Sequence, residues 1–131
     1  MKTLKDFLLE EYSAYVLDEH SRSILKEKFP PKYPEFIGHH ITYKFGVSKG
    51  SEPPSDPSSV NVIGYSDEDG LEALVVSIDG SNERPDGSVY HITWSLDRNK
   101  GKKPVHSNDL VKNGYDKIEP IKISVKPKIL K

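Results

Sequence analysis

Short apolar-rich stretches separated by polar segments run through most of the chain, and this pattern predicts strands. The predicted strands are residues 12–17, 39–47, 60–65, 71–78 and 89–96, followed by one or two strands within 118–130. The third and fourth strands flank Asp67-Glu68-Asp69-Gly70, whose acidic residues and glycine are typical of a hairpin turn. Polar loops rich in serine, proline or glycine follow the second and fourth strands.

Three other stretches have the spacing of helices. Thr3 caps the first, the second runs from Asp18 to about Phe29, and a short third helix begins with Ser107 as its cap and ends at Gly114. Two prolines end the second helix, because proline lacks the amide donor and disfavours helical geometry in the residue before it. Since strands outnumber helices and the two are interleaved, we expect an α+β fold with a mostly antiparallel sheet.

Length and composition are those of one domain without membrane spans. The chain has 131 residues, of which 34% are hydrophobic and 30% are charged, so residues 1–131 are expected to form a single domain. No apolar run approaches the roughly 20 residues of a transmembrane helix, and the first residues lack the features of a signal peptide. The chain has no cysteine, which excludes disulfides and thiol nucleophiles, and the expected compartment is the cytoplasm.

Charge is distributed unevenly along the chain. Residues 97–131 hold ten basic and four acidic residues, whereas residues 1–96 hold nine basic and sixteen acidic ones, for a net charge of −1. Proteins that follow a long nucleic-acid backbone usually present a broad basic surface. This chain has no overall excess of basic residues. We therefore expect a small anion or the end of a nucleic-acid chain as its partner, rather than a long nucleic acid.

The most informative feature is a repeated tetrapeptide. His40-Ile41-Thr42-Tyr43 and His91-Ile92-Thr93-Trp94 share the order His, Ile, Thr, aromatic, and both fall inside predicted strands. Because side chains alternate between the faces of a strand, each repeat places its His and Thr on one face and its Ile and aromatic residue on the other. We therefore expect the Ile and aromatic side chains in the core. If the two strands face each other, two imidazoles and two hydroxyls surround one cavity.

The candidate catalytic residues His40, Thr42, His91 and Thr93 suit hydrolysis of a phosphodiester. One neutral imidazole can take a proton from water while a second, protonated imidazole gives one to the departing alkoxide. Threonine hydroxyls can donate to the non-bridging oxygens, where charge develops. No metal or other cofactor is needed for this chemistry. A single His-x-Thr is more often an ordinary half-exposed pair, and the second copy with matched flanks favours the catalytic interpretation.

Two His-x-Thr-x sequences on separate strands resemble the signature of the two-histidine (2H) phosphoesterase superfamily. Similarity to the cyclic phosphodiesterase domain of fungal and plant tRNA ligases extends over about residues 12–113, and its markers are Gly38-His39-His40-Ile41-Thr42, Phe45-Gly46, Pro104-Val105 and Ser107-Asn108. The resemblance implies a two-lobed fold with one motif in each lobe and a central cleft. It also implies that His91 activates water, that His40 protonates the leaving oxygen and that Thr42 and Thr93 hold the phosphate.

The expected activity is metal-independent hydrolysis of a cyclic phosphodiester by a monomer. The substrate is a 2′,3′-cyclic phosphate or a related small cyclic nucleotide, either free or at an RNA end as in RNA repair. Two alternatives stay open at this point. One is a phage-type enzyme that evades host defence by cleaving a cyclic dinucleotide or oligonucleotide signal in the host cytoplasm. The other is a module without catalytic activity that binds a nucleotide or an RNA end. The sequence fixes neither the base nor the bond that is cleaved.

Several further residues are weaker candidates. Tyr33 and Phe36 precede the first motif and are predicted either to stack on a nucleobase or to close the end of the core. His39 is expected to point away from His40, either at the edge of the core or in a hydrogen-bonding role. The lysines within 100–103 form a solvated turn or attract an anionic substrate, and His106 is expected to be exposed.

Overall fold

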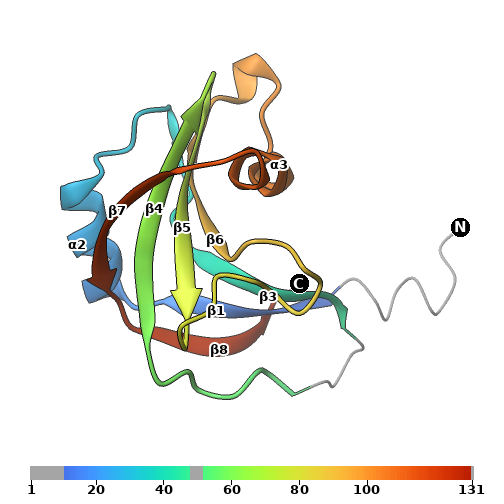
Figure 1. Ribbon diagram of the computed structural model, residues 1–131. Coiled ribbons are helices and arrows are strands. Elements are labelled where there is room, and N and C mark those ends of the chain that lie inside the picture. Colours follow the sequence, from blue (N-terminus) through green and yellow to red (C-terminus); the bar gives the residue numbers. More distant parts are fainter. Residues whose placement is uncertain (1–10, 48–51, 131) are drawn as a thin grey trace, which may run out of the picture.

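An antiparallel sheet forms the centre of the computed structural model, which describes residues 11–47 and 52–130 (Figure 1). Its strands are β1 (Glu11–Leu17), β2 (Glu35–Phe36), β3 (His40–Val47), β4 (Val60–Glu68), β5 (Leu71–Ile78), β6 (His91–Leu96), β7 (Asp116–Lys122) and β8 (Val125–Leu130). The strand order is β7-β4-β5-β6-β3-β1-β8, and the short β2 pairs with β6. The expected α+β class with a mostly antiparallel sheet is confirmed.

The sheet consists of two halves that meet at one pair of residues. Strands β7, β4, β5 and β6 form one half and β3, β1 and β8 form the other. Within the described residues, β3 and β6 pair only where Ile41 lies opposite Ile92, whereas β4 and β5 pair continuously from Val60 to Glu68 apart from one bulge. Figure 1 shows the strands of the two halves running in clearly different directions.

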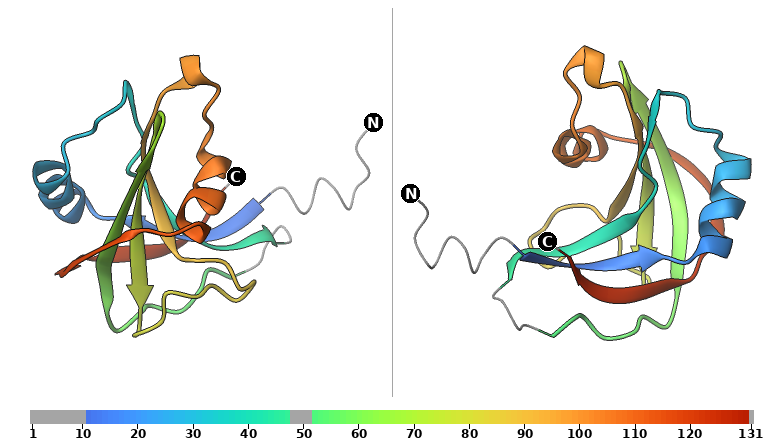
Figure 2. Two further views of the ribbon diagram at one scale, coloured as in Figure 1. Left: turned by 45° about the horizontal axis from the view of Figure 1, so that its top comes forward. Right: turned by 180° about the vertical axis from the view of Figure 1, so that it is seen from behind.

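Two helices cover opposite faces of the larger half. Helix α2 (Glu19–Lys28) begins at Asp18, whose carboxylate accepts a hydrogen bond from the Ser21 amide at 2.7 Å, and it buries Leu25 completely. Helix α3 (Ser107–Lys112) packs Leu110 and Val111 on the other face. Both views in Figure 2 place α2 and α3 on opposite sides of β4 and β5.

Strand β5 therefore lies between two apolar clusters. Its side chains alternate between the larger cluster beneath α2, which includes Leu74 and Val76, and the smaller cluster beneath α3, which includes Ala73 and Val75. This explains why nearly every residue of β5 is buried. The larger cluster also contains Ile41, Ile92 and Trp94, all fully buried, with Tyr43 packed against it. The predicted core positions of both repeats are confirmed.

Most predicted elements are present, with shifted ends. The hairpin is tighter than predicted, because β4 continues to Glu68 and the chain reverses at Asp69 and Gly70, which have φ angles of 42° and 99°. The final segment divides into β7 and β8. Strand β2 was not predicted, and the helix expected near Thr3 lies outside the described residues.

The predicted cap of the third helix is wrong. A short 3-10 turn, η2 (Pro104–His106), precedes α3, so Ser107 already has helical geometry and does not cap the helix. Its hydroxyl donates instead to the carbonyl oxygen of Pro104. A second 3-10 turn, η1 (Arg98–Lys100), follows β6. Among the described residues, no helix has the length and apolar character needed to cross a membrane.

Candidate functional site

The four residues of the two His-x-Thr pairs line one cavity of about 320 Å³. His40 and Thr42 lie on β3, and His91 and Thr93 lie on β6. Because Ile41 lies opposite Ile92 in an antiparallel pair, the flanking positions bring His40 towards Thr93 and Thr42 towards His91. Both isoleucines point into the core, so all four polar side chains share the other face. The arrangement is close to a twofold one around the isoleucine pair.

His91 is held in a defined protonation pattern. Its Nδ1 lies 2.8 Å from the carbonyl oxygen of Val89. A carbonyl can only accept, so Nδ1 carries the proton and the neutral ring keeps its lone pair on Nε2. Burial lowers the pKa of His91, and the nearby Arg84 guanidinium lowers it further, against the opposing effect of the Val89 hydrogen bond. His91 is therefore a neutral imidazole at pH 7, with a basic nitrogen available.

His40 has different neighbours. Its Nδ1 lies 3.0 Å from Nδ1 of His39, and its ring packs at a tilt against Tyr12, with the ring centres 5.4 Å apart. Burial, with smaller contributions from the neighbouring His39 and His91, lowers the pKa of His40 to about 4. Unlike a carbonyl, an imidazole partner can either donate or accept, so this contact permits both neutral forms of His40 as well as the protonated one.

The expectation that His39 points away from His40 is wrong, although its predicted hydrogen-bonding role is confirmed. His39 precedes β3, and the alternation of a strand therefore does not govern its side chain. Its carbonyl oxygen accepts a hydrogen bond from the Leu17 amide at 3.0 Å, and its ring is exposed next to that of His40.

The two threonines are not equivalent. Oγ1 of Thr93 lies 2.6 Å from Oγ of Ser107 and 3.4 Å from the carbonyl oxygen of Pro104. Ser107 is fully buried, so it connects β6 to the start of α3 through a chain of hydrogen bonds. Thr42 is almost completely buried beside the cavity. The sequence analysis named Ser107 as a helix cap and as a marker of the 2H resemblance, but did not predict this contact with Thr93.

Four further residues complete the wall of the cavity and were not predicted as site residues. They are mainly apolar: Tyr12, Ile37, Pro104 and Val105. Val105 is 61% exposed, which makes it the large apolar side chain that stands out most from the described surface. Pro104-Val105 was noted as a marker of the 2H resemblance but not as part of the site. Tyr12 and the η2 residues reach the cavity only through the pairing of β1 with β3 and the fold of the η2 turn.

Tyr33 and Phe36 do not line this cavity. The Tyr33 hydroxyl donates to the Asp67 carboxylate, and its amide donates to the Ser95 hydroxyl at 3.2 Å. Phe36 packs edge-on against Trp94, with 4.9 Å between the ring centres. The Arg22 guanidinium lies over the Phe36 ring, 4.5 Å from the ring centre. Of the two predicted roles, these contacts fit closure of the core rather than base stacking.

The donor set of the cavity consists of imidazoles and hydroxyls, with no carboxylate among the lining residues. Among the described residues, no group of three or more His, Cys, Asp or Glu is placed to hold a metal ion. The cavity therefore contains the His91 imidazole, whose Nε2 is basic, and the His40 imidazole, whose proton can lie on either nitrogen. Two hydroxyls and an apolar wall complete it. This combination is suited to proton transfer around a tetrahedral anion with an apolar substituent.

The chain was also compared with known proteins. No family model, no curated protein and no solved structure matches it. The geometry of the two His-x-Thr pairs is therefore the evidence from which a function is inferred.

Proposed function

We propose that the protein is a metal-independent phosphodiesterase of the 2H type, which hydrolyses a cyclic phosphodiester of a nucleotide, with 2′,3′-cyclic phosphate as the favoured substrate. The observation that carries this proposal is the convergence of both His-x-Thr pairs on one cavity from two strands. Pure binding of an anion does not require two imidazoles in this mutual arrangement. The two halves of the sheet would correspond to the two lobes of that fold, with one motif in each.

In the proposed reaction, His91 is the base. Its Nε2 lone pair accepts a proton from water while the water oxygen forms a bond to phosphorus. The bond between phosphorus and the leaving ribose oxygen breaks, and that oxygen takes the proton from Nε2 of His40. The products are a phosphomonoester and a free ribose hydroxyl, with His91 protonated and His40 neutral. Proton exchange with solvent restores both.

His40 needs a proton before it can act as the acid. Its lowered pKa means that the free protein holds it mostly neutral at pH 7. A bound phosphodiester carries a negative charge, which favours the protonated imidazole. The protonated His40 keeps a partner for Nδ1–H, because Nδ1 of His39 can accept. Binding of the substrate and charging of the acid are therefore coupled.

The threonines would stabilise the charge that develops on the phosphorus oxygens. Thr42 and Thr93 come from different strands, so their hydroxyls approach the phosphate from two directions. The apolar wall formed by Tyr12, Ile37 and Val105 would pack against the sugar or base.

The test is incubation of the protein with 2′,3′-cyclic mononucleotides, 3′,5′-cyclic mononucleotides and cyclic dinucleotides in EDTA, with products identified by mass spectrometry. We expect ring opening of the 2′,3′-cyclic phosphates, with loss of at least a hundredfold in rate for His40→Ala or His91→Ala. His20→Ala is the matched control, because His20 is exposed on α2.

The outcomes separate the alternatives. Cleavage of cyclic dinucleotides alone would favour an enzyme that degrades a defence signal. Stoichiometric binding without turnover would indicate a binding module. Activity that EDTA abolishes and added zinc or manganese restores would overturn the metal-independent mechanism.

A further inference from the structure

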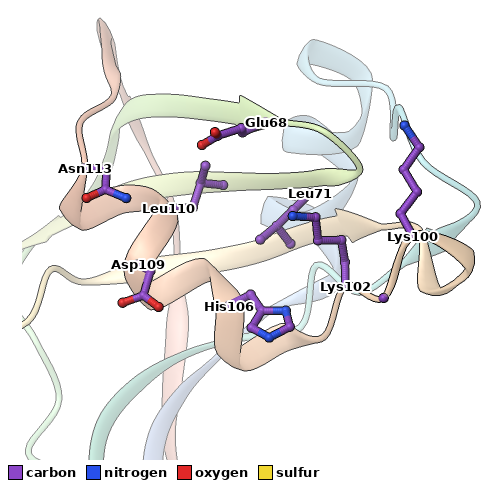
Figure 3. Close-up of a pocket in the computed structure, with 9 residues that line it drawn as sticks. Glu68, Leu71, Lys100, Lys102, His106, Asp109, Leu110 and Asn113 are labelled. Carbon is purple, nitrogen blue, oxygen red and sulfur yellow. The ribbon is translucent and has the colours of Figure 1, made fainter.

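A second cavity, of about 300 Å³, is lined by residues from three parts of the chain (Figure 3). Its walls come from the ends of β4 and β5, from the segment between β6 and α3, and from α3 with its C-terminal end. The lining residues are Glu68, Leu71, Lys100, Gly101, Lys102, His106, Asp109, Leu110 and Asn113. None of them belongs to the catalytic set.

The η2 turn contributes to both cavities. Pro104 and Val105 line the catalytic cavity, and the next residue, His106, lines the second one. Consecutive Cα atoms are about 3.8 Å apart, so the two cavities have neighbouring wall residues at the exposed Val105 and at His106.

His106 presents a hydrogen-bond donor in this cavity. Its Nδ1 lies 3.1 Å from the backbone nitrogen of Lys103. That N–H must donate, so Nδ1 accepts and the ring proton resides on Nε2. An Nε2–H donor on an exposed imidazole suits a phosphate oxygen.

The two lysines of the cavity differ in availability. Nζ of Lys100 lies 3.0 Å from the Asp69 carboxylate, and this pair lowers the pKa of Asp69. Among the residues that the structure describes, no carboxylate forms an ion pair within 4.0 Å of Lys102, although its charge also helps to lower the pKa of Asp69. Lys102 and His106 therefore form a cationic and donor pair next to the η2 turn.

The rest of the lining combines acidic, amide and apolar groups, unlike a site that binds any anion through positive charge alone. Two carboxylates, of Glu68 and Asp109, and the amide of Asn113 also line the cavity. Leu71 and Leu110 supply apolar surface. A ligand with one phosphate, an apolar ring and exocyclic amino groups has a complement for each of these features, and a nucleotide is such a ligand.

We infer that the second cavity binds a second nucleotide of the substrate, with its phosphate at Lys102 and His106, while the reacting phosphodiester occupies the catalytic cavity. This inference rests on the proposed function and narrows its substrate class to molecules with two or more linked nucleotides. Either a linear RNA end or a cyclic dinucleotide supplies that chemistry, and the experiment includes both.

The experiment compares kcat/KM for adenosine 2′,3′-cyclic phosphate, for a diadenosine ending in a 2′,3′-cyclic phosphate and for cyclic di-adenosine monophosphate. We expect one of the two dinucleotides to exceed the mononucleotide at least tenfold. Lys102→Ala and His106→Asn should each remove most of that advantage and leave the mononucleotide within twofold of wild type, because the asparagine Oδ1 can still accept from the Lys103 amide while the Nε2–H donor is lost. Lys103→Ala is the matched control, because Lys103 is exposed, adjacent and outside the cavity lining.

Equal kcat/KM for all three substrates would overturn the second site and leave the proposed function intact. The same holds if Lys102→Ala slows the mononucleotide as much as the dinucleotide, or if Lys103→Ala matches Lys102→Ala. If the wild-type protein hydrolyses none of the three, the proposed function fails and this inference fails with it.

Discussion

At the scale of single residues, the two histidines of the cavity differ in the group that holds Nδ1. A carbonyl oxygen fixes the neutral form of His91, whereas His40 shares a contact with a second imidazole. The first arrangement suits a base and the second suits an acid that must gain and lose a proton. The assignment of roles that the 2H resemblance implies thus has independent support in these contacts.

A substrate with a good leaving group tests this assignment. A p-nitrophenyl phosphodiester needs little protonation of its leaving oxygen, so it should restore His40→Ala to within about tenfold of wild type. His91→Ala should stay inactive, because water still lacks a base. The double variant should be no worse than His91→Ala, because effects within one catalytic unit are not additive. Rescue of His91→Ala instead would reverse the roles.

The lowered pKa values of both histidines predict an acidic optimum for kcat/KM. The productive form holds one protonated and one neutral histidine, so the rate is greatest between the two apparent pKa values of the free protein. Both values lie below the usual 6.5, with that of His40 about 4. The maximum of kcat/KM should therefore fall below pH 6.5, and that of kcat should lie higher, because the bound anion favours the protonated acid. A kcat/KM that rises steadily to pH 9 would contradict the mechanism.

The same shift affects folding. His40 titrates near its ordinary pKa when unfolded and at about 4 when folded, so the unfolded chain binds more protons between these values. The protein should therefore lose stability as the pH falls from about 6.5 to 4, with His40 responsible for up to about 3 kcal/mol. Urea unfolding of His40→Gln across this range should show a smaller loss than wild type. His20→Gln should behave like wild type, because His20 is exposed on α2.

At the scale of elements, the start of β3 depends on Gly38. This residue has φ +45°, and a Cβ atom added to it would lie 2.5 Å from the Phe36 ring and 3.0 Å from Trp94. Gly38→Ala should thus strain the backbone two residues before His40 and bring the added methyl group into steric overlap with both aromatic rings. Gly80 also has positive φ, at +86°, but a Cβ there meets nothing within 4 Å.

Denaturant unfolding of these two variants separates the two effects. Gly80→Ala should cost about 1 kcal/mol from strain alone, and Gly38→Ala should cost roughly 1–3 kcal/mol more. Equal losses would mean that the aromatic side chains move aside without cost.

At this scale, the sequence predicts the two faces of a strand but not which strands and turns come together. The alternation of Ile41 and Ile92 with polar neighbours correctly predicted which side chains enter the core and which share a cavity. The contributions of Tyr12 and Val105 to the wall could not be predicted, since they depend on which strands pair and where a 3-10 turn folds. Phe36 was ambiguous for a related reason, because an aromatic residue next to a motif fits a core contact as well as a ligand contact.

At the scale of the whole molecule, the site exists only when both halves of the sheet are assembled. Each half supplies one histidine and one threonine, so neither half alone holds both histidines of the cavity. Loss of activity in denaturant should therefore coincide with global unfolding followed by tryptophan fluorescence, since Trp94 is fully buried in the shared core. Activity that disappears at a lower denaturant concentration would show that the halves separate first.

Because β3 and β6 pair only at Ile41 and Ile92 among the described residues, hydrogen exchange at this junction should respond to ligand binding. The β3 amides that face β6 should exchange with deuterium faster than amides of the long β4–β5 ladder. In the proposed complex, a phosphate held by threonines from both strands would connect β3 to β6 at this junction. In exchange followed by mass spectrometry, saturating ligand should slow labelling of peptides that contain Ile41 or Ile92 and leave peptides of β7 unchanged. The isotope pattern would then report binding even for a catalytically dead variant.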